Sequence, residues 1–396
     1  MRQRALRFIG CPSCYGQLNA QVIEQAQMPV PETLRARVAA SGGEPAEFTT
    51  EVKEGFLLCP TCRYLYPVFN HVPRLFCYIT AAGRAFLARH AATVAKLRGE
   101  GFTTPDHLPE PGEASVQRSF TSEWGDYDYD GIIWDLSYEE RLRLCVREIG
   151  LAPESLAGKT LADIGCGIGV LTNSLVTHRG VEAVGVDLSD AVLRAARQYL
   201  SNPLLHFAQG SVFHLPLRKR HFDVGYSSGV LHHTYDTRRA FQSAAQVTKP
   251  GGRFYVWLYS AERSGVQGAI SIGNNLVRAA VCRMPRALQD ASVYGLTLLF
   301  WGARALLRSR LYGGKTTTYN WKQALHAARD IYTPRYAHHH TRAEVTSWFR
   351  EAGFVGIEAL ASERSEKVTS IPVSVRGEFR GAVVPDSLPL VRQAAS

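Results

Sequence analysis

The stretch Leu161-Ala-Asp-Ile-Gly-Cys-Gly-Ile-Gly169, followed by Val181-Glu-Ala-Val-Gly-Val-Asp187, decides the fold. The pattern predicts a strand, a glycine turn, a helix and a second strand that ends in a carboxylate. Glycines at such a turn let the backbone approach a ligand closely where the helix begins. Asp187 is then placed to accept hydrogen bonds from a ribose. The two stretches together predict a site for a nucleotide-type cofactor.

The spacing of the glycines distinguishes between cofactors. A dinucleotide turn needs G-x-G-x-x-G, whereas this turn has Gly165, Gly167 and Gly169, with a valine at the third dinucleotide position. Asp163 precedes the turn, and its carboxylate would repel a pyrophosphate but suits a cofactor with a cationic amino-acid end. S-adenosylmethionine (SAM) carries an ammonium, a sulfonium and a ribose. Asp163 and Asp187 therefore match the two ends of SAM.

Four further motifs follow the second strand in a fixed order. They are Leu215-Pro-Leu217, Phe222-Asp223, Val230-Leu-His-His233 and Lys249-Pro-Gly-Gly252. With the glycine turn, they resemble the class I SAM-dependent methyltransferases, in the branch that includes the ubiquinone and menaquinone C-methyltransferases. The resemblance covers about residues 119–260, with a return near 341–375. It implies an α/β fold with a doubly wound, Rossmann-like sheet of seven strands.

The same resemblance assigns the cofactor-binding residues. Asp163 and the glycines would hold the methionine part, Asp187 the ribose, and residues 210–212 the adenine. Ser211 stands where the family usually has Asp, although a hydroxyl can still make one hydrogen bond. The full predicted set is Asp163, Gly165, Cys166, Gly167, Gly169, Asp187, Leu188, Gly210, Ser211, Val212, Ser228 and Gly229.

Two histidines are the candidates for acceptor chemistry. Methyl transfer from a sulfonium is an in-line displacement that needs alignment and, for a hydroxyl or acidic C–H acceptor, removal of a proton. His232 and His233 follow the fourth predicted strand, where enzymes of this class present acceptor-side residues. One of them could be the general base. The alternative is that both belong to the wall of the site, because the motif is common to enzymes with different substrates.

Four cysteines form two C-x-x-C pairs near the N-terminus. Cys11-Pro-Ser-Cys14 and Cys59-Pro-Thr-Cys62 could supply four thiolates to a tetrahedral Zn²⁺, although their 44-residue gap is longer than in simple ribbons. The following Tyr66-Pro-Val-Phe-Asn-His-Val-Pro-Arg-Leu75 resembles the ending of the small zinc-ribbon proteins that activate methyltransferases. Zinc that only folds the domain, a docking surface, and C-x-x-C redox chemistry are the three alternatives.

The pattern of strands, helices and charge divides the chain into segments. Strands are predicted at 160–164, 182–187, 205–209, 222–227, 252–259, 354–360 and 368–375, and helices at 81–98, 170–178, 190–200, 238–247 and 341–353. Ser189 is the predicted N-cap of the third helix, and Thr341 with Glu344 a capping box. The predicted segments are a zinc ribbon (1–78), a helix and linker (79–118), the SAM-binding core (119–260), a helical insertion that acts as acceptor lid (261–340), the last helix and strands of the core (341–380) and a tail (381–396).

The insertion is basic and apolar. Eleven Lys and Arg against three acids lie between residues 261 and 336, so most of the net charge of +10 is there. Residues 291–303 carry no charge, and Arg304, Arg308 and Arg310 follow. Thirteen residues are too few to span a bilayer. The segment could be a buried lid helix or could lie in a membrane interface through 291–310, whereas its interleaved Leu and Phe disfavour nucleic acid.

The sequence thus predicts a SAM-dependent methyltransferase with a structural Zn²⁺. We expect O- or C-methylation of a hydrophobic small molecule or lipid-like acceptor. One alternative is an RNA methyltransferase whose ribbon binds RNA, and another is a non-catalytic SAM-binding or partner-activating module. Residues 1–10 lack the apolar core of a signal peptide, so we expect a cytoplasmic protein, with peripheral membrane contact as an open possibility.

Overall fold

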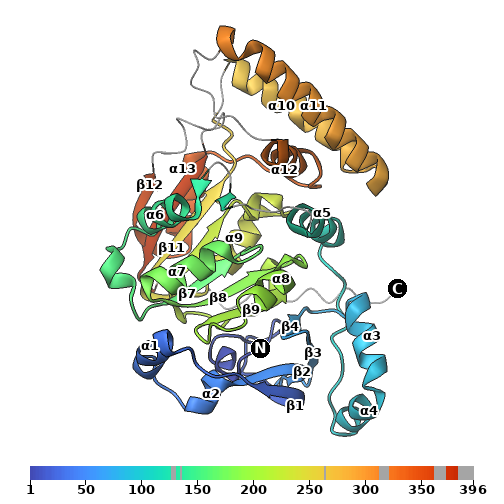
Figure 1. The fold of residues 1–396 in the computed structure, drawn as a ribbon, viewed down its shortest axis with the longest axis vertical. Coiled ribbons are helices and arrows are strands. Elements are labelled where there is room, and N and C mark those ends of the chain that lie inside the picture. The colour runs from blue at the N-terminus through green and yellow to red at the C-terminus, as the bar shows by residue number, and fades with distance from the viewer. Residues whose placement is uncertain (126–130, 134–135, 263–264, 312–320, 361–371, 382–396) are drawn as a thin grey trace.

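The structure is a computed structural model of the 396-residue chain (Figure 1). It describes residues 1–125, 131–133, 136–262, 265–311, 321–360 and 372–381. Within these ranges, the side chains of 132–133, 265–270 and 301–311 are not described.

One sheet of eleven strands runs through the described part of the chain, in the order β1-β2-β3-β4-β9-β8-β7-β10-β11-β13-β12. Its strands are β1 Asn19–Gln27, β2 Thr50–Leu58, β3 Leu65–Phe69, β4 Val72–Leu75, β7 Thr160–Ile164, β8 Glu182–Asp187, β9 Leu205–Gly210, β10 Phe222–Ser228, β11 Thr248–Leu258, β12 Phe354–Leu360 and β13 Val373–Phe379. A short hairpin pairs β5 Ile132–Ile133 with β6 Leu136–Ser137.

The seven strands from β9 to β12 in this order form the predicted doubly wound sheet. Strands β9, β8, β7, β10 and β11 are parallel, and β13 runs antiparallel between β11 and β12. One face packs on α6 Tyr138–Ile149, α7 Val170–Arg179 and α8 Ala191–Gln198, and the other on α9 Thr237–Ala245 and α13 Arg342–Glu351. The carboxyl ends of the parallel strands are therefore the edge where a ligand site is expected.

The expected elements of this half are confirmed with three differences. Strand β13 begins at Val373, and residues 368–371 of the predicted strand lie outside the described residues. The residue directly before α8 is Asp190, which makes no side-chain cap bond. Ser189, the predicted N-cap, still makes the capping contact, because its hydroxyl accepts from the Ala191 N–H while it donates to Asp187. Strand β11 begins four residues earlier than expected. The capping box at the start of α13 is present as predicted.

The helix predicted over 81–98 is two helices. They are α3 Ala81–Arg89 and α4 Ala91–Gly99, with a break at His90. The His90 backbone leaves the helical region, its ring lies 4.5 Å from Phe86, and its Nε2 is 3.1 Å from Oε2 of Glu54 on β2. A tertiary contact with the ribbon thus ends a helix that no local glycine or proline interrupts.

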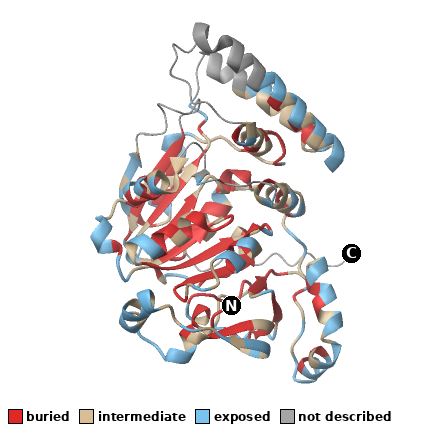
Figure 2. Cartoon of the chain, in the orientation of Figure 1, coloured by how far each residue is buried: buried red, intermediate tan, exposed pale blue. Residues whose placement is uncertain are grey.

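The N-terminal ribbon continues the sheet of the second half. Strand β4 pairs in parallel with β9, with Leu75 opposite Gly210. Arg4 forms an ion pair with Glu182 of β8, and Phe8 stacks on His206 of β9. One buried cluster contains side chains of both halves. The remaining short ribbon helices are α1 Arg35–Ala40 and α2 Pro45–Thr49. Ribbon and core are therefore one folded body, which Figure 2 shows as continuous buried residues.

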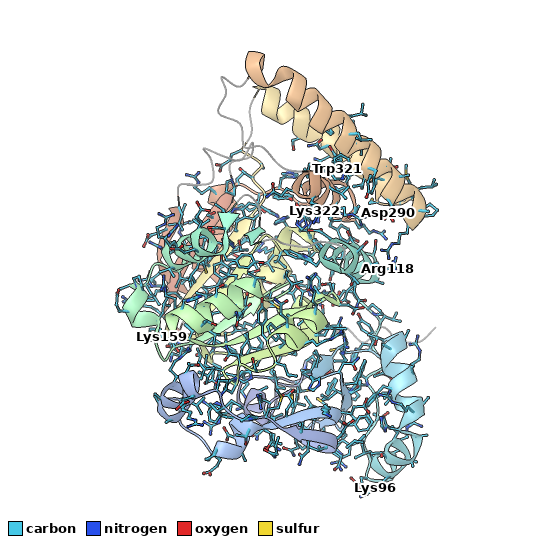
Figure 3. All side chains as sticks on the ribbon, viewed as in Figure 1. Lys96, Arg118, Lys159, Asp290, Trp321 and Lys322 are labelled. Carbon is cyan, nitrogen blue, oxygen red and sulfur yellow. The ribbon has the colours of Figure 1, made fainter. Side chains whose placement is uncertain are left out.

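Four helices lie at the carboxyl edge of the sheet. They are α5 Glu113–Gly125, α10 Gly265–Val281, α11 Arg286–Leu311 and α12 Trp321–Tyr332. Helices α10 and α11 lie side by side at the end of the molecule opposite the ribbon, above α12 (Figure 1). Asp290 of α11 is 3.1 Å from Arg329, and Tyr294 packs on Trp321 (Figure 3, with Asp290 and Trp321 labelled). The predicted insertion is thus a helical hairpin resting on a helix that faces the sheet.

Candidate cofactor and acceptor site

The glycine turn after β7 is built as its sequence requires. Gly165, Gly167 and Gly169 all have positive φ, a region that residues with a Cβ rarely adopt. A Cβ at Gly165 would lie 2.3 Å from Val230, and one at Gly167 would lie 3.3 Å from the ring of Trp124 on α5. The backbone of the turn therefore lies close to α5 on one side and to the start of the loop after β10 on the other.

Asp187 ends β8 directly beside this turn. Its Oδ2 accepts from the Gly167 N–H at 2.8 Å, and its Oδ1 accepts from the Ser189 N–H and hydroxyl at 2.8 and 2.6 Å. Burial raises the pKa of Asp187. The carboxylate is thus fixed in one orientation at the carboxyl edge, as a ribose-binding group requires.

Asp163 is buried at the end of β7. Its Oδ2 accepts from the Thr172 hydroxyl of α7 at 2.5 Å. Burial raises the pKa of Asp163 to about 6, against the opposing influence of Thr172 and Arg141. Burial also raises the pKa of the Cys166 thiol well above its usual range. Cys166 is consequently a neutral wall residue, while Asp163 ionises near neutral pH and could face a cation.

The predicted adenine side lies where the ribbon meets the core. A Cβ at Gly210 would lie 2.9 Å from the Leu75 carbonyl of β4. The Ser211 hydroxyl accepts from the Phe213 N–H at 3.3 Å, next to Val212. Leu188 accepts from the Gln209 amide through its carbonyl at 3.0 Å. These residues line the predicted adenine side of the site, and Leu75 of the ribbon lies against them.

The opposite side is formed by the end of β10. Ser228 accepts through its hydroxyl from Arg141 of α6 at 3.2 Å, and Gly229 N–H donates to the Trp257 carbonyl at 3.1 Å. Arg141 also donates to the Tyr226 hydroxyl and lies 3.3 Å from Glu148. These contacts fix the end of β10 against α6 and β11.

His232 is fully buried among aromatic rings. Its ring centroid is 3.9 Å from that of Tyr259 and 4.2 Å from that of His233, and neither of its nitrogens has a hydrogen-bond partner among the described residues. Burial and then the neighbouring His233 lower the pKa of His232 well below its usual value. His232 is therefore a neutral ring that packs the site, in agreement with the wall alternative for one histidine.

His233 is held in one tautomer. Its Nδ1 is 2.9 Å from the Tyr336 carbonyl, which can only accept, so Nδ1 carries the proton and the Nε2 lone pair is left available in the neutral ring. Nε2 lies 3.6 Å from Oδ1 of Asp330 on α12, and the Tyr259 hydroxyl donates to the other Asp330 oxygen at 2.5 Å. The ring of Phe120 packs against His233. His233 can therefore accept a proton beside a carboxylate.

Asp330 of α12 is not among the residues predicted from the sequence. Burial alone would raise its pKa, but His233 and the Tyr259 hydroxyl outweigh burial and the pKa is lowered. Asp330 consequently stays ionised and can stabilise positive charge on His233. No motif marks this residue, and only the fold brings it from the insertion to the loop after β10.

A second carboxyl, also missed, lies under the same helix. Glu123 of α5 is buried, with Oε1 3.2 Å from Nε2 of His326 on α12. Burial, then Asp330, raises the pKa of Glu123 well above its usual range, and burial lowers the pKa of His326 to about 4. Both shifts favour a neutral pair.

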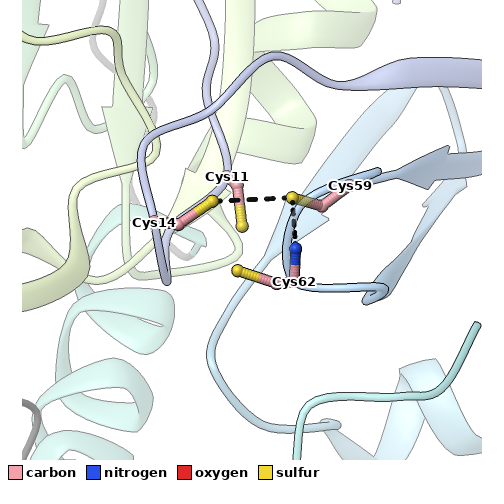
Figure 4. A group of neighbouring side chains, drawn as sticks. All are labelled: Cys11, Cys14, Cys59 and Cys62. Atoms are coloured by element: carbon pink, nitrogen blue, oxygen red, sulfur yellow. Dashed lines mark hydrogen bonds between the residues drawn. The ribbon is translucent and has the colours of Figure 1, made fainter.

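The four ribbon cysteines converge. Their Sγ atoms lie within 4.8 Å of one another, with 3.6 Å between Cys14 and Cys59 (Figure 4). A tetrahedral Zn²⁺ with bonds of about 2.3 Å places its sulfurs about 3.8 Å apart, so the four thiols fit this ion. The Tyr66 hydroxyl lies 3.1 Å from the Sγ of Cys11. The set has four protein ligands, as closed structural sites do.

Comparison with known proteins identifies the central domain. Residues 162–256 match the family described as "Methyltransferase domain". A ubiquinone biosynthesis O-methyltransferase from Nitrosospira multiformis is 34% identical over 100 residues, which are 24% of this chain and 41% of the relative. An uncharacterized 37.1 kDa protein in transposon TN4556 of Streptomyces fradiae is 28% identical over 184 residues, which are 46% of this chain and 47% of the relative.

The chain also resembles solved structures of methyltransferases. A phosphoethanolamine N-methyltransferase 2 from Haemonchus contortus, in complex with SAM, has a TM-score of 0.38 and 15% identity, over 64% of this chain and 44% of that one. The chain spans about half the length of the curated relatives it matches. With the matched family and the observed sheet order, it contains a class I SAM-dependent methyltransferase domain.

Proposed function

We propose that this protein is a SAM-dependent O-methyltransferase whose acceptor is a hydrophobic small molecule or lipid-like molecule with an ionisable hydroxyl. The observation that carries the proposal is the fixed tautomer of His233, whose Nε2 lone pair lies 3.6 Å from Asp330. Oxygen must lose a proton as it gains the methyl group, and a positioned histidine can take that proton.

The residues of the glycine turn support SAM as the methyl donor. When bound, SAM supplies an electrophilic methyl group on a sulfonium. Asp187 would accept hydrogen bonds from the ribose, and the ionised form of Asp163 would face the cationic methionine end. The Cys11, Cys14, Cys59 and Cys62 thiolates would hold a structural Zn²⁺ that cross-links the ribbon.

The surroundings of His233 support an aromatic or apolar acceptor. Phe120 packs on one side of the imidazole and Tyr259 on another, with ring centroids 5.0 and 5.5 Å away. Proton transfer from the acceptor oxygen to Nε2 would create an imidazolium, and the ionised Asp330 stabilises that charge. Because relatives named O-methyltransferases match this domain, we prefer O- over C-methylation.

The experiment measures transfer of radiolabelled methyl from SAM to hydrophobic phenols and, in parallel, to total RNA. We expect label in organic extracts as a methyl ether. The substitution His233→Asn keeps a donor for the Tyr336 carbonyl but removes the base, so kcat should fall by roughly 10²–10⁴-fold with SAM affinity unchanged. His178→Asn, at an exposed histidine on α7, is the matched control and should leave kcat unchanged.

Three outcomes would contradict the proposal. Label that appears only in RNA would support the RNA methyltransferase alternative. Tight SAM binding without transfer to either class would support a non-catalytic module. Equal kcat for His233→Asn and the parent chain would remove His233 as the base.

A further inference from the structure

The helical hairpin of α10 and α11 exposes large apolar side chains. Tyr294 and six aliphatic or phenylalanine side chains are between 47% and 71% exposed, whereas three other large apolar residues are exposed in the rest of the described chain. The seven are Ile272 and Leu276 on α10 and Leu288, Tyr294, Leu298, Leu299 and Phe300 on α11. Tyr294 packs on Trp321 and Phe300 on Tyr332, both of α12. We call the other five, Ile272, Leu276, Leu288, Leu298 and Leu299, the hairpin surface; Figure 2 colours parts of these helices as exposed.

The hairpin surface is one face of an amphipathic element. The opposite face of α11 buries Val293 and Thr297, and Val293 packs with Val281 of α10 and Ala328 of α12. The hairpin is therefore already anchored to the protein through its inner face. Its outer face carries the five exposed aliphatic side chains, and exposed apolar side chains gathered on one element mark interaction sites. The exposed side chains of Leu298 and Leu299 do not fit the buried-lid alternative for this segment, although Val293 and Thr297 on its inner face are buried.

Positive charge accompanies the apolar surface. Arg283 and Arg286, both exposed, lie where α10 connects to α11, and Arg304, Arg308 and Arg310 follow Phe300 in the sequence. Residues 261–336 hold eleven Lys and Arg against three acids. Arg286 lies 3.8 Å from Asp290, so its charge is partly compensated, but the excess remains large. A basic flank beside exposed aliphatic side chains is complementary to an anionic lipid surface.

Among the described helices, none combines the length and apolar character that a membrane span requires. The two-sided pattern of the hairpin suits a position parallel to a surface, with one face buried in the headgroup region.

We propose that the hairpin surface docks on membranes that contain anionic lipids. The apolar side chains would enter the headgroup boundary, and Arg283 and Arg286 would meet the lipid charges. A second copy of the chain fits less well, because two hairpins with the same positive excess repel each other. The proposal rests on this surface alone and is independent of the methyl acceptor.

The test is co-sedimentation of the full chain with phosphatidylcholine vesicles, with and without phosphatidylserine. We expect binding to the mixed vesicles that weakens as salt is raised. The triple variant Leu288→Ser, Leu298→Ser and Leu299→Ser should lower that affinity by about tenfold or more, because three apolar groups no longer leave water. The control Leu108→Ser removes an equally exposed leucine elsewhere and should bind like the parent.

Arg283→Glu tests the charge component in the same assay and should weaken binding to the mixed vesicles only. SAM affinity of each variant, which should equal that of the parent, shows that the fold is intact. Absence of binding to either vesicle, or equal binding of the triple variant and the parent, would overturn the proposal. A concentration-dependent dimer that the triple variant abolishes, without vesicle binding, would instead assign the surface to a second copy of the chain.

Discussion

At the scale of single residues, the site depends on carboxyls whose burial changes their ionisation. Asp163, Asp187, Glu123 and Asp330 lie near the carboxyl edge, but they differ in the direction of their pKa shifts. Only Asp330 is shifted toward the ionised form, because His233 and Tyr259 both favour its charge. Asp163 and Asp187, next to the glycine turn, are instead shifted toward the neutral form, and a bound cation would lower their pKa values and favour ionisation.

This contrast predicts a pH dependence for SAM binding. The pKa of Asp163 is raised to about 6, so below this pH the free site is mostly neutral and SAM must displace a proton. Affinity should fall by up to about tenfold per pH unit below 6 and level off above it. The unliganded chain should show the opposite trend, since a raised carboxyl pKa favours the folded state at low pH and this stability is lost as pH rises through about 6.

Calorimetric titrations between pH 5 and 8 would measure this slope, with the ordinary range of carboxyl pKa values as reference. In Asp163→Asn the slope should decrease, with only the contribution of Asp187 left, and affinity at pH 8 should be weaker. Identical slopes in both proteins would mean that Asp163 does not face the cofactor.

At the scale of elements, the sequence predicted what local patterns encode. The glycine turn, the strands β7 and β8 and the α13 capping box follow from alternation, spacing and caps, and the structure contains them. The break at His90 and the role of Asp330 could not be predicted. Both come from contacts between elements far apart in the chain, Glu54 with His90 and α12 with the loop after β10.

Helix α12 shows how one element serves two surfaces. Ala328 and Tyr332 pack under the hairpin, while His326 and Asp330 face α5 and His233. An amphipathic pattern over 321–332 predicts a helix, but it does not distinguish the side that meets a hairpin from the side that meets a reaction site. That distinction needs the packing partners.

At the scale of the whole molecule, the ribbon and the methyltransferase half form one sheet. The sequence predicts the ribbon and the core as two separate segments, because the C-x-x-C pairs and the glycine turn are independent motifs. The pairing of β4 with β9 joins residues more than a hundred positions apart, and Phe8 and Arg4 contribute to the contact. Such long-range pairing leaves no local signal, because any edge strand of suitable length could have been the partner.

A shared sheet and core predict that both halves unfold together. Cys59→Ser should lower bound zinc below one equivalent and move a single thermal transition of the entire chain to lower temperature. Metal analysis and calorimetry on the same sample test this, with Cys282→Ser, a cysteine outside the cluster, as the control. Full zinc retention would contradict the four-thiolate site, and a separate low-temperature transition would contradict the single body.

The measurement that tests the central claim most directly is calorimetric titration of the purified chain with SAM. We predict one site of about micromolar affinity, weakened by at least roughly tenfold, about 1.4 kcal/mol, in Asp187→Ala because the ribose loses its carboxylate partner. Absence of binding by the parent chain, or equal affinity in the variant, would contradict a SAM site at the turn between Asp163 and Asp187.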